Sequence, residues 1–315
     1  MCEACKLPYE GHITDVPGVK VGHAQDERAR TGVSVALFER GAVGSVDVRG
    51  GSPGTRETDL LRAENMVSVV HAVALCGGSA FGLDAAGGVM RYLEEKDIGY
   101  PTKVAKIPIV CAAVLFDLGV GSAKIRPDAA MGYDAVARAG GDLRQGPYGA
   151  GCGATCAKGI PQSVPARGGI GSASVPLPGG GVVGAMIAVN ALGDVVDPHS
   201  GEVVACGTIG GVPTSMAAAF GWIGAEGEAG SNTTIGLVAT DVALDKGGCK
   251  RLAMSAHDGL ALAIRPAHTP YDGDTLFAVS TGEKRCEPAI LHAAVVEAVA
   301  RATVNAVMAS KGAET

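Results

Sequence analysis

A few residues with chemically useful side chains lie at the ends of predicted strands and loops. Thr233 carries a hydroxyl near the start of a predicted strand, 232–241, and Lys158 carries an ammonium at the end of a Gly-rich stretch. Asn190 ends another predicted strand and supplies a carboxamide, whereas Asp272 and Asp274 form a pair of carboxylates. These are group types that nucleophilic and acid–base catalysis use.

Each of these residues also has a purely structural explanation. Thr233 is β-branched and suits a strand. Lys158 suits a solvated loop, Asn190 the first position of a turn, and Asp272 and Asp274 the cap of a hairpin. Composition alone therefore does not join them into one site.

Metal and nucleotide sites find little support in the motifs. His257, His268 and Asp272 lack ligand spacing, because no H-x-x-x-H pair occurs and His257 falls within a predicted helix; helix-capping or buried, hydrogen-bonded histidines are the simpler interpretation. The stretch 149–158 does not match G-x-x-x-x-G-K-[ST], and the D-G-D segment that ends at Asp274 lacks the downstream Glu of a calcium loop. No G-x-S-x-G motif is present. We expect no metal and no organic cofactor.

The chain length fits one large globular domain or two modest ones. The chain has 315 residues, of which 47% are apolar, 48 are glycine and only 4% are aromatic, so an aliphatic core with many tight turns is expected. A net charge of −6 without basic runs argues against nucleic acid. The apolar stretches are too short to span a bilayer and the N-terminus has no signal-like apolar region, so we expect a cytoplasmic protein without a membrane partner.

The nine cysteines are expected to be reduced. They are spread widely along the chain, as is typical of small buried residues rather than of a disulfide framework. Cys2 and Cys5 form a C-x-x-C pair, but no second pair lies at zinc-ribbon spacing and no strand precedes it. We assign this pair no function.

Helical and strand periodicities alternate along the chain without a clear linker. Predicted helices cover 57–67, 78–96, 127–139, 248–264 and 288–309. Predicted strands cover 33–38, 42–48, 107–116, 168–175, 181–189, 232–241 and 276–280, with Gly-rich loops at 49–55 and 221–231. Strands in two groups with helices outside them predict a layered α/β sandwich rather than a simple parallel sheet.

Seven segments together carry a resemblance to a known family. They are VPGVKVGHA (16–24), DVRGGSPGTRETDLL (47–61), CGGSAFGLDAAGGVM (76–90), IPIVCAAVLFDL (107–118), GAGCGATCAKG (149–159), NTTIGLVATD (232–241) and IRPAHTPYDGDTLFAVSTG (264–282). In this order they resemble the DmpA-type aminopeptidases, which are N-terminal-nucleophile hydrolases. Members of that family include D-aminopeptidases, β-peptidyl aminopeptidases and hydrolases of 6-aminohexanoate (nylon) oligomers.

The resemblance implies a self-cleaving enzyme with a four-layer αββα sandwich, like that of the ornithine acetyltransferases. Alignment on the A-T-D sequence that ends at Asp241 places the cut between Asn232 and Thr233. A single domain, 1–315, would become an α chain, 1–232, and a β chain, 233–315. The resemblance also implies a homotetramer, and it assigns Thr233 as the nucleophile.

The same resemblance places Lys158, Asn190, Asp272 and Asp274 around the nucleophile. A free threonine α-amine has an ordinary pKa near ~8, so it can be the base for its own hydroxyl. A nearby Lys158 ammonium would favour the neutral amine, and the carboxylates would keep that lysine charged and orient the amine and the hydroxyl. Asn190 would donate to the oxyanion, a type of contact worth about 3 kcal/mol.

Two features of the sequence bear on which branch of the family the chain resembles. Asn before the cut, Thr as nucleophile and the D-G-D-T segment resemble the oligomer hydrolases, so we expect substrates among small peptides and ω-amino-acid oligomers. Phe116 stands where many relatives have a tyrosine that faces the oxyanion, and it cannot donate a hydrogen bond. An acyl transferase of the ornithine type and a non-catalytic binding protein on the same fold are the alternatives.

Overall fold

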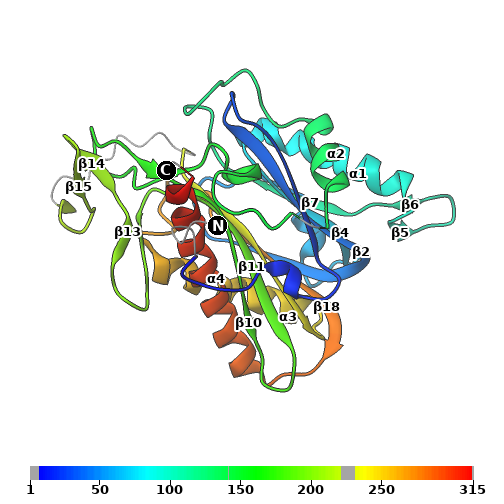
Figure 1. Cartoon of the computed structure of the whole chain (residues 1–315). Coiled ribbons are helices and arrows are strands. Elements are labelled where there is room, and N and C mark those ends of the chain that lie inside the picture. Colours follow the sequence, from blue (N-terminus) through cyan, green and yellow to red (C-terminus); the bar gives the residue numbers. More distant parts are fainter. Residues whose placement is uncertain (1–6, 141, 221–230, 314–315) are drawn as a thin grey trace.

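The computed structural model describes residues 7–140, 142–220 and 231–313. Figure 1 shows strands in the middle of the molecule, with one pair of helices on each side of them. Cys2, Cys5 and most of the predicted loop 221–231 lie outside the described residues. The other seven cysteines are free, and five of them are buried.

A nine-stranded mixed sheet forms the centre of the fold. Eight strands follow the order β10-β11-β16-β18-β2-β4-β7-β3, and β1 pairs with β2. Their bounds are β1 Lys20–Asp26, β2 Thr31–Val48, β3 Thr55–Arg56, β4 Val69–Cys76, β7 Val110–Val114, β10 Gly169–Pro176, β11 Val182–Asn190, β16 Thr233–Val242 and β18 Thr275–Lys284.

The long strand β2 connects two halves of this sheet. Its first part pairs with β1 and β4, its second part pairs with β18, and the register shifts between Leu37 and Ala42. Gly41 at this shift has a φ of +75°, a conformation that favours glycine. The predicted strands 33–38 and 42–48 are therefore parts of one strand that is irregular between them.

The two sheet halves face each other across an apolar core. Leu75 of β4 and Phe38 of β2 share this core with Met186 of β11 and Phe277 of β18. On β18, Phe277 faces this core while its neighbour Leu276 faces a second one, because successive side chains of a strand point to opposite faces.

Helices cover the outer face of each half. The helix α1 (Ala85–Glu95) packs on β4 and β7 and α2 (Ala129–Ala137) packs on β1 and β2, whereas α3 (Lys246–Ala263) and α4 (Pro288–Gly312) pack on the half that contains β11 and β16 (Figure 1). The three apolar cores thus separate four layers. This arrangement confirms the predicted αββα sandwich.

The last helix, α4, is long and apolar enough by composition to cross a membrane, but 67% of its most apolar window is buried inside the fold. It lies close to β10, where a Cβ on Gly171 would come 2.1 Å from the carbonyl oxygen of Ala302. The absence of a side chain at this glycine permits the close approach of helix and strand. This burial is typical of a core helix in a globular protein.

Short strands complete the structure outside the main sheet. They are β5 Tyr100–Pro101, β6 Lys106–Ile107, β8 Thr155–Cys156, β9 Ala166–Arg167, β12 Asp194–Val196, β13 Val203–Ala205, β14 Gly207–Ile209, β15 Val212–Thr214 and β17 Ile264–Arg265. They pair as β5-β6, β8-β9, β14-β15 and β13-β12-β17.

The predicted helix 57–67 is wrong. Only the short 3₁₀ helix Asp59–Leu61 forms there, and Glu57 has a left-handed φ of +61°. The ammonium of Lys246, which is far away in the sequence, donates to the carbonyl oxygens of Leu60, Asn65 and Val67. Backbone carbonyl groups that would accept hydrogen bonds within a helix therefore accept them from Lys246 of α3 instead.

The predicted helix 78–96 also begins differently. Its first part is a 3₁₀ helix, Ser79–Asp84, and the α-helix α1 starts only at Ala85. Ser79 has a left-handed φ of +54°, and Gly78 is the N-cap of this 3₁₀ helix.

Candidate active site

Strand register brings the predicted catalytic residues to one end of β16. Thr233, the first residue of β16, lies opposite Asn190, the last residue of β11. On the other side, Asn232 forms a parallel bridge with Asp272, just before β18. Residues that are distant in sequence therefore meet where neighbouring strands begin and end.

Lys158 binds the oxygen atoms on one side of Thr233. Its Nζ lies 3.0 Å from the carbonyl oxygen of Asn190, 3.1 Å from Oδ1 of the same residue and 3.1 Å from the carbonyl oxygen of Ser231. Three acceptors match the three N–H donors of an ammonium. Burial nevertheless lowers the pKa of Lys158 to about 7, although Cys156 and Asp272 raise it in part.

This result modifies one sequence-based expectation. The carboxylate of Asp272 does favour the charged form of Lys158, but its effect is smaller than that of burial. The site therefore contains an amine whose protonation changes near neutral pH.

Asn190 is completely buried, and its carboxamide is fully used. Its Oδ1 accepts from the Thr155 amide at 3.0 Å as well as from Lys158, and its Nδ2 donates to the carbonyl oxygens of Phe116 (3.0 Å) and Ser231 (3.4 Å). In the uncut chain this donor thus contacts the residue before Asn232 and not the Asn232 carbonyl itself.

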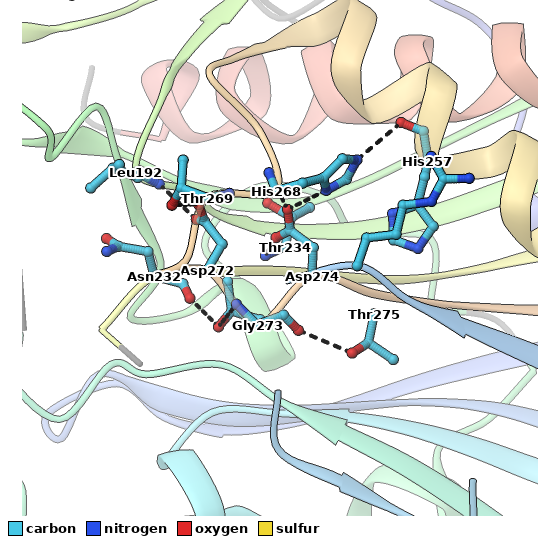
Figure 2. A network of polar contacts seen from close by, with 12 residues as sticks. Leu192, Asn232, Thr234, His257, His268, Thr269, Asp272, Gly273, Asp274 and Thr275 are labelled. Carbon is cyan, nitrogen blue, oxygen red and sulfur yellow. Dashed lines mark hydrogen bonds and ion pairs between the residues drawn. The ribbon is translucent and has the colours of Figure 1, made fainter. Parts of the chain in front are cut away.

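The hydroxyl of Thr233 lies against the peptide bond that precedes it. Its Oγ1 donates to the carbonyl oxygen of Asn232 and accepts from the Gly273 amide at 3.2 Å. The Gly273 amide also donates to the Asn232 carbonyl oxygen at 3.0 Å, as Figure 2 shows. One N–H group therefore contacts both the hydroxyl and the carbonyl of the bond that the sequence predicts to be cut.

The two aspartates accept hydrogen bonds from backbone amides around Thr233, and Figure 2 shows them within this network. Asp272 accepts from the Thr269 amide at 3.0 Å and from the Leu192 amide at 3.3 Å. Asp274 accepts from the Thr234 amide at 2.7 Å. Burial raises the pKa of Asp272, and the charge of Asp274 raises it further.

His268 is a member of this network that the sequence reasoning did not include. Its amide and its Nδ1 lie 3.0 Å and 2.7 Å from Oδ2 of Asp274, and its Nε2 lies 3.4 Å from the carbonyl oxygen of His257. Both ring nitrogens thus face acceptors. Burial alone would lower the pKa of His268, but the Asp274 carboxylate outweighs burial and the net pKa is raised.

His257 is a buried core histidine, in agreement with the structural interpretation of its motif. Its Nε2 lies 3.0 Å from the carbonyl oxygen of Asp47, and burial lowers its pKa to about 4, so the ring is neutral at pH 7. Its ring packs edge-on against that of His268 at 4.8 Å between centroids. Within the described ranges, no three His, Cys, Asp or Glu residues gather as a metal site.

A small pocket of about 120 Å³ opens beside Thr233. Residues 52–54 of the Gly-rich loop, 79 and 80 of the 3₁₀ helix before α1, and 114–116 at the end of β7 form its walls. Phe116 lines this pocket, so the residue that replaces the family tyrosine faces the site without a donor. We refer to this space as the Thr233 pocket.

The layered fold, with a site at the ends of its central strands, defines the structural class of this protein. Two solved enzymes share the fold: the L-aminopeptidase D-Ala-esterase/amidase from Ochrobactrum anthropi, described as a variant of the Ntn-hydrolase fold, and a Burkholderia sp. β-aminopeptidase. The first has a TM-score of 0.72 at 22% identity over 96% of this chain and 89% of its own. The second has a TM-score of 0.69 at 23% identity over 96% and 88%. The fold is therefore that of the N-terminal-nucleophile hydrolases.

Sequence comparison gives the family. The model of peptidase family S58 matches residues 11–315, so the chain belongs to this family and is an amide-hydrolysing enzyme. An uncharacterized aminopeptidase of Mycobacterium tuberculosis is 46% identical over 88% of this chain and 83% of its own length. The 6-aminohexanoate-oligomer endohydrolase of Paenarthrobacter ureafaciens is 32% identical over 85% and 74%.

The His268 contact leads to a prediction about the rate of amide hydrolysis. His268 has a left-handed φ of +59°, which asparagine tolerates, so His268→Asn should keep the backbone conformation while removing the imidazole. Hydrogen bonds to charged groups contribute about 1.5–3 kcal/mol. We expect kcat to fall at least about tenfold, because Asp274 loses a donor that orients it, and Tm to fall by a few degrees, because the lost hydrogen bond also stabilises the fold.

His199→Asn is the matched control. His199 also pairs with a carboxylate, that of Glu297 at 2.7 Å, but it lies exposed on the surface. Its substitution should leave kcat unchanged. Wild-type kcat in the folded His268→Asn variant would show that this histidine does not position Asp274.

Proposed function

We propose that the chain cuts itself between Asn232 and Thr233 and then hydrolyses amide bonds with Thr233 as N-terminal nucleophile. The observation that carries this proposal is the contact between the Thr233 hydroxyl, the Asn232 carbonyl and the Gly273 amide. A hydroxyl, the carbonyl before it and a backbone donor on that carbonyl are the parts that an intramolecular acyl shift requires.

In the first step, Oγ1 of Thr233 attacks the carbonyl carbon of Asn232. The Gly273 N–H stabilises the negative charge that develops on the carbonyl oxygen, with which it already forms a hydrogen bond. The C–N bond breaks, the proton of the hydroxyl passes to the leaving nitrogen, and an ester joins the two parts. Water then hydrolyses the ester, which leaves a carboxylate on Asn232 and a free α-amine on Thr233.

In the second stage, the new α-amine accepts the proton of the Thr233 hydroxyl as it attacks a substrate carbonyl. The acyl-threonine that forms releases the amine product and is then hydrolysed by water. Lys158 binds the carbonyl oxygen of Asn190, the residue that pairs with Thr233 across the two strands, so its charge lowers the amine's affinity for a proton. The N–H of Asn190 that contacts Ser231 becomes available to an oxyanion once the cut end moves away.

The substrates that we propose are small peptides and ω-amino-acid oligomers such as 6-aminohexanoate oligomers. Two relatives support this range by name, an aminopeptidase and a 6-aminohexanoate-oligomer endohydrolase. The methyl group of threonine restricts its rotamers and crowds the attacking oxygen, so an acyl group without a branch beside its carbonyl is accommodated best.

Self-cleavage gives the first prediction of this mechanism. Thr233→Val keeps the shape of threonine but removes the hydroxyl, so the chain should stay whole and inactive. Thr234→Val is the matched control, because the buried Thr234 hydroxyl has no hydrogen-bond partner among the described residues. Intact mass should show fragments 1–232 and 233–315 for wild type and for Thr234→Val only. A cut Thr233→Val chain would exclude Thr233 as the nucleophile.

The pH dependence of kcat/KM gives the second prediction of this mechanism. The α-amine must be neutral to act as a base, so kcat/KM should rise with pH through the pKa of that amine. In Lys158→Gln the neighbouring charge is lost, and the amine's pKa should rise toward its ordinary value near ~8. The acidic limb of the kcat/KM profile should therefore move to higher pH, with a reduced maximum.

Lys20→Gln serves as its control, because Lys20 forms an exposed ion pair with Glu39. This variant should reproduce the wild-type profile. An acidic limb that stays in place in cleaved Lys158→Gln protein would contradict the role assigned to Lys158.

The range of substrates gives the third prediction of this mechanism. We expect turnover of a linear 6-aminohexanoate oligomer above a Thr233→Val blank, and a kcat/KM at least as high as that on an α-peptide of similar length. Product release is followed by chromatography on protein shown to be cleaved. Good peptide turnover without oligomer turnover would place the chain with the aminopeptidases. Turnover of acetyl-ornithine without any hydrolysis of peptides would instead favour the acyl transferase.

A further inference from the structure

The first four residues of the Gly-rich loop, 49–52, hold the segment that carries Gly273. The first two amides of this stretch donate to the carbonyl oxygen of Asp274 at 3.0 and 3.3 Å, and its last amide, that of Ser52, donates to the carbonyl oxygen of Asp272 at 2.9 Å. These carbonyl groups belong to the residues on either side of Gly273. The position of the Gly273 amide, which is the donor to the scissile carbonyl oxygen in the proposed mechanism, therefore depends on where the loop lies.

This stretch of the loop has little rigidity of its own. Two of its four residues are glycine, and glycine loses more conformational freedom on folding than any other residue. A Cβ on Gly50 would come 2.3 Å from the carbonyl oxygen of Asp272, so the close contact between the two segments requires glycine here. A backbone of this kind keeps one conformation only when other groups hold it.

The side chain of Arg49 attaches the loop to helix α3. Its Nη2 donates to the carbonyl oxygen of Met254 at 3.0 Å, and its Nε donates to Oδ2 of Asp47 at 3.0 Å. Its Nη1 lies 3.6 Å from Oδ1 of Asp258. The guanidinium thus contacts β2 through Asp47 and α3 through the other two residues. Because its donors form a planar, preorganised fork, little freedom is lost for each contact that it makes.

The same helix holds the neighbours of Arg49. Lys250 of α3 lies with its Nζ 2.5 Å from Oδ1 of Asp47, and Nε2 of His257 lies 3.0 Å from the carbonyl oxygen of Asp47. The carbonyl oxygen of His257 in turn lies 3.4 Å from Nε2 of His268, the ring that contacts Asp274. Helix α3 therefore supports the site from two directions, through the Gly-rich loop and through His268.

The proposed cut makes the attachment of the loop more important. Residues 49–52 belong to the proposed α chain, 1–232, whereas Gly273 and α3 belong to the proposed β chain, 233–315. After the cut, the contacts of Arg49 with α3 are non-covalent links between the two chains, close to the reacting atoms.

We propose that Arg49 is a positioning residue for amide hydrolysis, because its guanidinium fixes the Gly-rich loop on α3 and thereby holds the Gly273 amide against the scissile carbonyl oxygen. Arg49 acts through the loop and not by contact with the reacting atoms. This inference rests on the proposed function, since it assumes that Thr233 attacks that carbonyl. Negative charge develops on the carbonyl oxygen during the attack, so a displaced donor weakens the transition state more than it weakens substrate binding.

Arg49→Gln tests this role. Glutamine keeps a side-chain N–H donor but loses the charge and the fork that contacts both elements. On protein shown to be cleaved, kcat for a small peptide or a 6-aminohexanoate oligomer should fall at least about tenfold, whereas KM should change less than about threefold. The rate of self-cleavage, followed by intact mass during cell-free synthesis, should fall by a similar factor, because the same amide serves both steps.

Lys250→Gln is the matched control. Lys250 also joins β2 to α3, through Oδ1 of Asp47 and the carbonyl oxygen of Val46, but it contacts the strand rather than the loop. Both variants lose contacts with α3 or β2, so both should lower the Tm by a few degrees. In Lys250→Gln, however, kcat and the rate of self-cleavage should stay within about twofold of wild type, as is typical of a partly exposed ion pair.

Arg49→Lys is a milder variant that keeps the charge. Its ammonium can contact Asp47 or α3 but lacks the fork that contacts both at once. We expect kcat to fall at least about threefold with a nearly unchanged KM. A wild-type kcat in Arg49→Lys would contradict the anchoring by the guanidinium, whether or not Arg49→Gln folds.

The remaining outcomes separate this inference from the proposed function. Where wild-type protein is cut and turns over substrate above a Thr233→Val blank, equal rates in Arg49→Gln and Lys250→Gln overturn the positioning role alone. An Arg49→Gln variant with a raised KM and an unchanged kcat does the same. Wild-type protein that stays whole and hydrolyses neither peptide nor oligomer overturns the proposed function and this inference with it.

Discussion

The hydrogen bonds of the Gly273 amide hold the centre of the site together. This N–H contacts the Asn232 carbonyl and the Thr233 hydroxyl at once, and the residue lies between Asp272 and Asp274. A Cβ at Gly273 would come 2.6 Å from the carbonyl oxygen of Ser52 and 2.8 Å from the Thr233 hydroxyl. Only glycine lets the backbone approach this closely, so one small residue permits the close packing of the Gly-rich loop, the start of β18 and the Thr233 hydroxyl.

Burial then sets the protonation of the groups around this centre. It lowers the pKa of Lys158 to about 7 and raises that of Asp272, so each moves toward its neutral form. His268 is the exception, because its contact with Asp274 outweighs burial. An amine near its pKa can change charge at little cost, which suits the proposed mechanism, in which the α-amine of Thr233 acts as a base.

Patterns within the sequence predicted the elements that depend on local periodicity. The helices α3 and α4 and the strands β10, β11, β16 and β18 agree with their predicted positions to within a few residues. The predicted helix 57–67 failed because Lys246, more than 180 residues away, binds its carbonyl groups. No local pattern contains such a partner.

The site residues also divide into those that sequence motifs identify and one that they do not. Thr233, Lys158, Asp272 and Asp274 lie in segments that resemble the family, whereas Asn190 lies outside them, and the structure brings all five together at one strand end. His268 lies in one of the same motifs, H-T-P-Y-D-G-D, yet its role depends on a left-handed backbone that turns its ring toward Asp274. A histidine six residues before an aspartate does not indicate this geometry. One sequence signal could have indicated the contact between His268 and Asp274. Because His268 lacks metal-ligand spacing, a nearby carboxylate is the expected hydrogen-bond partner of its ring.

The uncut chain is, in this mechanism, its own first substrate. The Asn232 carbonyl occupies the position of a scissile carbonyl, with Thr233 as attacking group and Gly273 as donor. Thr233 is only 2% exposed, so a second molecule has little access to its hydroxyl until the segment that ends at Asn232 leaves. The donor that serves the first acyl transfer then serves those that follow, because the same strand ends hold it in place. In the proposed mechanism, self-cleavage and turnover thus depend on the same arrangement of backbone groups around Gly273.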